Sequence, residues 1–105
     1  KGIGVKKAAI AGAGAIGERL AQVLMNEAWM GYRVEGFYDD FRTEVTQLAK
    51  GTKTNILGNM KDLVKDAHEG RFDAVFIAFP MRDEHRIVEI LDALGDTVVS
   101  VYFAP

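Results

Sequence analysis

Three glycines at fixed spacing form the strongest chemical signal in this sequence. They occupy the first, third and sixth positions of the run Gly12-Ala13-Gly14-Ala15-Ile16-Gly17, which reads G-x-G-x-x-G. Between a strand and a helix, Gly12 would allow a tight turn, Gly14 the approach of a pyrophosphate, and Gly17 close packing of the helix on the sheet. The start of that helix offers free N–H groups and a partial positive charge. The sequence therefore predicts a phosphate-binding loop; the alternative is a tight turn that binds nothing.

Two aspartates, Asp39 and Asp40, end the second apolar segment. Asp39 follows the glycine run at close to the spacing of about 20 residues at which a carboxylate accepts hydrogen bonds from a ribose. Arg42 complicates this reading, because an arginine there can accommodate a 2′-phosphate, whereas an acidic residue favours the unphosphorylated ribose. A solvated acidic turn at a strand end is the alternative.

The loop after the fourth apolar segment contains Pro80 and Arg82. In parallel sheets, loops at the carboxyl ends of strands face the ligand, so Arg82 is a candidate phosphate contact. It is otherwise an exposed arginine near a helix start. His68 and His85 have no partner at metal-ligand spacing, and we expect both on the surface and no metal site. Without cysteine, thiolate chemistry and disulfides are excluded.

Short apolar runs alternate with amphipathic stretches throughout the chain, which is typical of β-α-β units. Strands are expected at residues 7–11, 33–38, 55–57, 73–79 and 97–103. Helices are expected at 15–28, 43–50, between the N-cap Asn59 and a stop at Gly70, and at 83–94. Right-handed crossovers then give a doubly wound, mainly parallel five-stranded α/β sheet of order 3-2-1-4-5, with helices on both faces. We predict one Rossmann-like domain over residues 1–105.

Composition limits the possible partners. The chain has 105 residues, of which 49% are hydrophobic and 27% charged, with a net charge of −2. These values are ordinary for one globular domain, and the charge argues against nucleic acid as a partner. No apolar run reaches the roughly 18–20 residues of a membrane helix. The chain lacks an initial methionine and stops just after an apolar run, so we expect a segment of a longer protein.

Several runs together resemble a known family, the cytoplasmic Rossmann-like, CoA-binding-like domain of bacterial polyprenyl glycosylphosphotransferases. Members are also called undecaprenyl-phosphate glucose or galactose phosphotransferases. The resemblance rests on residues 8–14, 34–40, 56–63, 75–82 and 97–105, and so covers nearly the whole chain.

The resemblance implies a nucleotide-binding, regulatory cytoplasmic domain of an inner-membrane enzyme. Such an enzyme moves a sugar 1-phosphate from a UDP-sugar to undecaprenyl phosphate in exopolysaccharide or capsule synthesis. Membrane and catalytic segments of the parent chain are the implied partners, and no catalytic residue is expected here. The ligand stays open among NAD(H), NADP(H), CoA and a UDP-sugar.

Two other functions remain possible from the sequence. One is the NAD-binding domain of a nucleotide-sugar dehydratase or epimerase. The chain has no Tyr-x-x-x-Lys pair of the short-chain dehydrogenase type and no second domain to hold a substrate. The other is a structural module that binds no ligand and forms a homo-oligomer.

Overall fold

A single parallel sheet organises the computed structural model, which describes residues 4–41, 55–80 and 83–104. Its strands are β1 (Lys6–Ala11), β2 (Tyr32–Tyr38), β3 (Ile56–Gly58), β4 (Ala74–Ile77) and β5 (Ser100–Phe103). Their order is β3-β2-β1-β4-β5, and every neighbouring pair is parallel. The predicted topology is therefore confirmed. The helix predicted at 43–50 lies outside the described residues.

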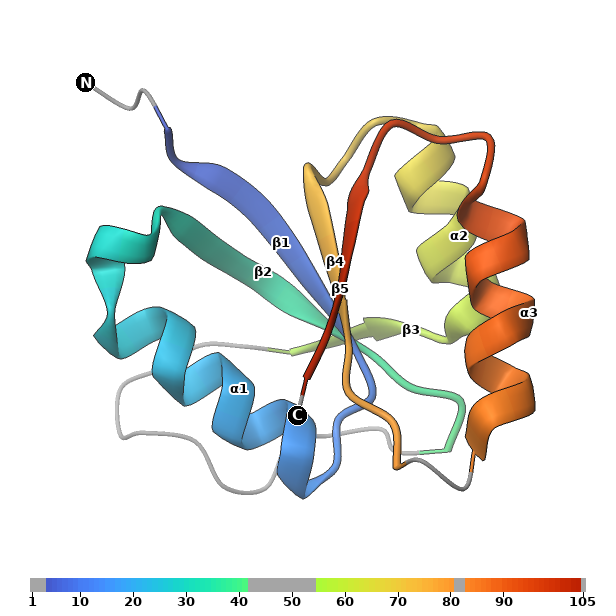
Figure 1. Cartoon of the computed structure of the whole chain (residues 1–105), viewed down its shortest axis with the longest axis horizontal. Coiled ribbons are helices and arrows are strands. Elements are labelled where there is room, and N and C mark those ends of the chain that lie inside the picture. The colour runs from blue at the N-terminus through green and yellow to red at the C-terminus, as the bar shows by residue number, and fades with distance from the viewer. Residues whose placement is uncertain (1–3, 42–54, 81–82, 105) are drawn as a thin grey trace.

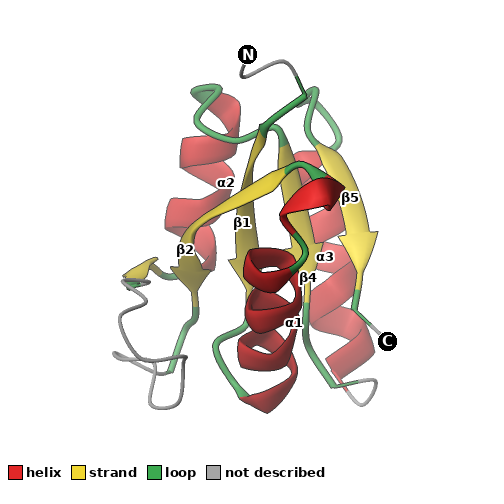
Figure 2. Cartoon of the chain, turned by 90° about the vertical axis from the view of Figure 1, so that its left-hand side faces the viewer, coloured by secondary structure: helices red, strands yellow, loops and turns green. Residues whose placement is uncertain are grey.

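Helices cover both faces of the sheet, as predicted. Helix α1 (Ala15–Asn26) lies on one face, and α2 (Met60–His68) and α3 (Glu84–Leu94) lie on the other (Figures 1 and 2). A short 3-10 turn, Ala28–Met30, separates α1 from β2, so the first helix ends before the predicted residue 28. Strands β4 and β5 are also shorter than predicted, because the ladder between them runs only from Ala74 to Ile77 and from Ser100 to Phe103.

Strand β1 explains why its sequence is apolar without alternation. Ala9 and Ala11 face the core formed with α2 and α3, whereas Ala8 and Ile10 face the core formed with α1. A strand buried on both faces needs apolar residues at every position. The central strand thus ends, with both sides packed, at the glycine loop.

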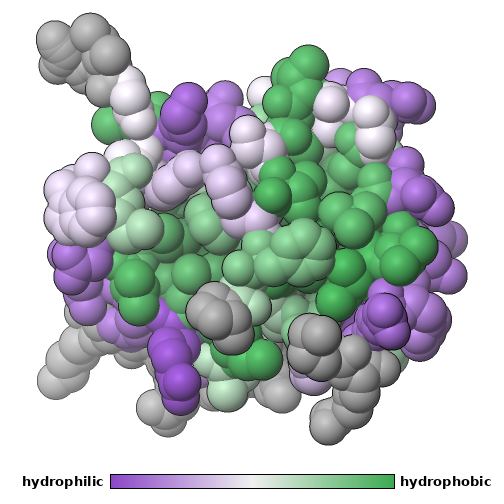
Figure 3. Space-filling view, viewed as in Figure 1, coloured by the Kyte–Doolittle hydropathy of each residue, from purple (hydrophilic) through white to green (hydrophobic). Residues whose placement is uncertain are grey.

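Helical periodicity in the sequence places Val23 on the apolar face of α1 and Leu91 on that of α3, which predicts that both are buried. Val23 is 43% exposed and Leu91 is 37% exposed, so this prediction was wrong: the sheet covers less of each helix than its apolar face. Ile90 and Leu94, one turn apart, point at the sheet, and Leu91 is rotated away from it. Figure 3 shows hydrophobic surface over α3 and β5. The exposed apolar side chains of these two elements include Val88, Leu91 and Phe103.

The start of α2 follows the prediction. The Asn59 side chain accepts from the Asp62 N–H, and the Asp62 carboxylate accepts from the Asn59 N–H, which completes a capping box. Gly70 follows the helix with a φ of +79°, a conformation that favours glycine. The capping box at Asn59 thus fixes the start of α2 directly after the carboxyl end of β3.

Tyr38 gives the fold a predicted alkaline sensitivity. Its buried hydroxyl donates to the Asp66 carboxylate at 2.5 Å, and burial together with that carboxylate raises the pKa of Tyr38 well above the usual 10. A raised pKa in the folded state contributes stability that is complete below pH 10 and is lost as the pH rises further.

Tyr38→Phe should lower the free energy of unfolding by about 1.5 kcal/mol at pH 8. Between pH 8 and pH 11 the gap between the two proteins should shrink by roughly 1 kcal/mol. Urea unfolding of both proteins at both pH values measures this difference in the free energy of unfolding. A difference that does not change with pH would contradict a raised pKa of Tyr38 in the folded state.

Candidate functional site

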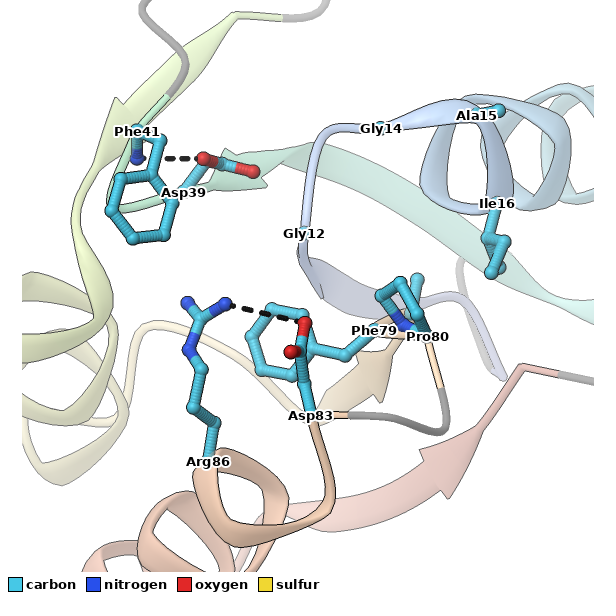
Figure 4. Close-up of a pocket in the computed structure, with 11 residues that line it drawn as sticks. Gly12, Gly14, Ala15, Ile16, Asp39, Phe41, Phe79, Pro80, Asp83 and Arg86 are labelled. Carbon is cyan, nitrogen blue, oxygen red and sulfur yellow. Dashed lines mark hydrogen bonds and ion pairs between the residues drawn. The ribbon is translucent and has the colours of Figure 1, made fainter.

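A cavity of about 660 Å³ opens at the carboxyl ends of the central strands (Figure 4). It gathers the glycine loop after β1, the end of β2, the loop after β4 and the first turn of α3. Its lining residues are Gly12, Gly14, Ala15, Ile16, Asp39, Phe41, Ala78, Phe79, Pro80, Asp83 and Arg86. Six of them were singled out from the sequence: Gly12, Gly14, Ala15, Ile16, Asp39 and Pro80. The topology therefore brings together segments that lie far apart in the sequence.

The fold itself requires two of the three motif glycines. Gly12 has a φ of +110°, and a Cβ there would lie 2.9 Å from the Ala78 carbonyl oxygen. Gly17 is buried in the first turn of α1, where a Cβ would overlap the carbonyl oxygen of Gly12. These two positions match the roles expected for a tight turn and for close helix packing.

Gly14 differs from the other two. It is the N-cap of α1, with a φ of −84° and a ψ of −163°, an extended conformation open to any residue. Glycine has no side chain to accept a hydrogen bond from the first turn of the helix, as Ser, Thr, Asp or Asn would at this position. It lines the cavity beside the N–H groups of the first turn, which have no acceptor within the helix. Backbone conformation therefore gives no reason for glycine at this position.

Asp39 ties the glycine loop to the end of β2. One carboxylate oxygen accepts from the Ala13 N–H at 2.8 Å, and the other accepts from the Phe41 N–H at 2.8 Å. Asp39 also lines the cavity, where a ribose contact was predicted. Ala13 itself is buried and does not line the cavity; its N–H binds Asp39, which does. The carboxylate thus has a structural role that the sequence spacing did not indicate.

Asp40 points to a different set of partners. Its carboxylate accepts from the Met60 N–H at 2.9 Å, at the start of α2, and pairs with Arg86 at 3.1 Å. It is not among the residues that line the cavity. Arg42 and Arg82, the two predicted cationic contacts, lie outside the described residues. The ligand contacts predicted for Asp40, Arg42 and Arg82 thus stay predictions.

Arg86 is the main site residue that sequence reasoning missed. Its guanidinium, 21% exposed, pairs with Asp40 and, at 3.7 Å, with Asp83. It also lies over the rings of Phe79 and Phe41, at 4.3 and 5.4 Å from their centroids. The available signal was an Asp and an Arg three residues apart, on the first turn of a helix that follows a central strand. An Asp–Arg pair at this spacing is also typical of an ordinary helix start, so the pattern alone does not indicate a binding site.

Two absences concern the described ranges only. Within 4–41, 55–80 and 83–104, no three His, Asp or Glu side chains are grouped to hold a metal ion. In the same ranges, no helix combines the length and apolar composition that a membrane crossing requires.

Sequence comparison identifies a family across almost the whole chain. Residues 3–105 match the model of a CoA-binding domain. The chain is also 33% identical, over 104 residues, to the UDP-glucose:undecaprenyl-phosphate glucose-1-phosphate transferase of Escherichia coli (strain K12). That alignment takes in 99% of this chain but 21% of the relative, so the chain spans about a fifth of the transferase.

Solved structures agree with this assignment. UDP-D-quinovosamine 4-dehydrogenase from Vibrio fischeri superimposes with a TM-score of 0.65 at 26% identity, over 95% of this chain and 78% of that one. RSP, a Rex-family repressor solved in complex with β-NADH, gives a TM-score of 0.63 at 16% identity, over 94% and 53% of the two chains. The second likeness shows the fold alone. The sheet order, the glycine loop and the family match together lead to one conclusion: this chain belongs to the CoA-binding domain family, and is homologous to a segment that makes up about a fifth of undecaprenyl-phosphate glucose-1-phosphate transferases.

Proposed function

We propose that this chain binds a nucleotide, with the ligand's phosphates over Gly14, Ala15 and Ile16. The observation that carries the proposal is Gly14, a glycine that its backbone conformation does not require, at the mouth of the cavity and at the positive end of α1. A side chain at this position would occupy the space through which a phosphate reaches the helix N–H groups.

The size and chemistry of the cavity fit a nucleotide. Its volume lies within the roughly 300–1,000 Å³ of small-molecule sites. Asp39 lines the cavity, at the distance along the chain expected for a ribose contact. The NADH bound by RSP is compatible with a dinucleotide on this fold. NAD(H), NADP(H), CoA and a UDP-sugar remain the candidate ligands.

A direct test uses the amide signals of the loop. Isotopically labelled protein is titrated separately with NAD, NADP, CoA and UDP-glucose, and native mass spectrometry of untreated protein identifies any co-purified molecule. At least one ligand should shift the amide signals of Gly14 to Ile16 in a saturable way. Saturable binding that leaves those signals in place would locate the phosphates elsewhere, and no binding by any of the four would refute the proposal.

Local charge leads to a prediction about the ribose. Asp39 and Asp83 line the described part of the cavity and Asp40 adjoins it, against the one guanidinium of Arg86. A 2′-phosphate brought to this region would face like charges at short range. NAD should therefore bind at least about fivefold more tightly than NADP, roughly 1 kcal/mol. Parallel calorimetric titrations at one fixed salt concentration measure the ratio, and tighter binding of NADP would overturn this charge argument.

We further propose that the chain is a regulatory cytoplasmic domain of an inner-membrane glycosyl-phosphate transferase. The homology to the Escherichia coli enzyme supports this. Transfer of a sugar 1-phosphate from a UDP-sugar to undecaprenyl phosphate, in exopolysaccharide or capsule synthesis, would belong to segments of the parent outside this chain. The exposed apolar side chains of α3 and β5, including Val88, Leu91 and Phe103, are suited to contact such segments or a second copy. Nucleic acid is not an expected partner.

A second candidate is favoured by one comparison. The 26% identity to a nucleotide-sugar dehydrogenase, of which the chain covers 78%, keeps an NAD-binding domain of a dehydratase or epimerase open. The gene beyond residue 105 discriminates the two: membrane and transferase segments support the first, and an extended dehydrogenase domain the second. A structural dimerisation module is the remaining alternative, and saturable binding of any of the four ligands would exclude it.

A further inference from the structure

Phe41 is a large apolar side chain that stands exposed at the rim of the cavity. It is 81% exposed, although its backbone N–H is fixed by the Asp39 carboxylate at 2.8 Å. Its ring lines the cavity together with Arg86 and Phe79, and Figure 4 shows it beside Asp39, across the cavity from α3. The backbone of Phe41 is thus held in place while its ring stays exposed to solvent, outside the hydrophobic core.

Phe79, Arg86 and Phe41 form a stack of unequal halves. The inner half is tight, because the guanidinium lies 4.3 Å from the ring centroid of the buried Phe79. The outer half is loose, since the same guanidinium lies 5.4 Å from the centroid of Phe41, near the limit of about 6 Å for such contacts. The edges of the guanidinium are engaged by Asp40 and Asp83, so its orientation is fixed. The contact with Phe41 is therefore the looser side of the stack, and the one at which a flat group would enter.

We infer that Phe41 and Arg86 form a base clamp, in which the nucleotide's base stacks on the Phe41 ring and against the Arg86 guanidinium. This inference rests on the proposed function and makes both side chains specificity-determining residues of that site. A ribose held by Asp39 brings its base to the neighbourhood of Phe41, whose N–H bonds to the same carboxylate. Bases have flat π faces that stack on aromatic rings and on guanidinium planes alike. The ligand class is then a nucleoside diphosphate, recognised through its base as well as its phosphates.

The test separates base recognition from phosphate recognition in the whole chain. Phe41→Ala removes the ring but keeps the backbone N–H that Asp39 accepts, and Phe41→Trp restores a stacking surface. Trp29→Ala is a matched control, because Trp29 is 80% exposed and lies in the turn before β2, at the other end of that strand. Affinities for ADP, UDP and inorganic pyrophosphate are measured by amide-shift titration of each protein.

The expected pattern is selective. Phe41→Ala should weaken ADP and UDP by roughly 5- to 150-fold, the range that stacking on one aromatic side chain supplies, and pyrophosphate by less than about twofold. Phe41→Trp should bind ADP about as well as the wild type, and Trp29→Ala should match the wild type for all three probes. Equal ADP affinity in Phe41→Ala, or equal losses for ADP and pyrophosphate, would overturn the base clamp while leaving nucleotide binding intact. If the wild-type protein binds one of the four candidate ligands but none of these three probes, the base clamp fails while nucleotide binding stands; if it binds neither set, the proposed function fails and the clamp fails with it.

Discussion

Gly17→Ala is expected to lower the free energy of unfolding by about 3 kcal/mol or more, a large part of the roughly 5–15 kcal/mol of a typical domain. Gly17 lies in the first turn of α1, and its Cβ would overlap the Gly12 carbonyl oxygen and lie 3.1 Å from the Gly12 carbonyl carbon. Gly12 is itself held at a φ of +110° against the backbone of Ala78. The atoms that the new Cβ meets belong to the backbone, which cannot rotate away as a flexible side chain can. The helix and the glycine loop would therefore have to move apart.

The sign of this effect is informative because helix propensity predicts the opposite. Alanine is favoured over glycine inside a helix by about 1 kcal/mol. At an exposed helical position, a change from glycine to alanine would therefore be expected to stabilise the protein. Gly95→Ala is the control: its φ of −61° is ordinary, and its Cβ would lie 3.3 Å from the Asp92 carbonyl oxygen, a tight contact but far milder than the overlap at Gly17. Urea unfolding followed by circular dichroism compares the two variants, and equal stability would show that α1 does not pack on the loop as described.

Gly14→Val is expected to weaken nucleotide binding by at least about tenfold, or 1.4 kcal/mol, while the fold persists. The extended backbone at Gly14 accepts a β-branched residue, and the loss of a glycine N-cap should lower stability by less than about 1 kcal/mol. The isopropyl group would instead occupy the lining of the cavity where the phosphates are proposed to lie. Substitutions at positions 14 and 17 therefore separate binding from folding within one motif.

The measurement is a calorimetric titration of wild type and variant with whichever ligand binds the wild type best. Gly14→Ala should give an intermediate affinity, because its methyl group fills less of the approach. Gly95→Ala, outside the cavity, should bind as the wild type does. Equal affinities across this series would mean that the phosphates do not lie over the glycine loop, even if a nucleotide binds.

The order of the strands was predictable because the relevant signals are local. Apolar runs, the glycine spacing and the caps of α2 are each contained within a few residues, and crossover handedness limits how such units assemble. The capping box at Asn59 and Asp62, and the turn at Gly70, are read from neighbouring positions. The apolar faces of α1 and α3 were predicted too broadly, since sequence periodicity does not show how much of a helix the sheet covers.

By itself, the sequence determined the fold class, the sheet order and the place of the glycine loop, because the signals for each element are local and crossover handedness limits how the elements assemble. Only the tertiary structure decided how the site is built. It brings Arg86 from α3 to Asp40 at the end of β2, across 46 positions of sequence, and sets the same guanidinium between Phe79 and Phe41. It also separates Gly17, which close packing requires to be glycine, from Gly14, whose backbone conformation does not. Such contacts arise when parallel strands bring their carboxyl ends to one edge, and no local pattern records which side chains then meet there.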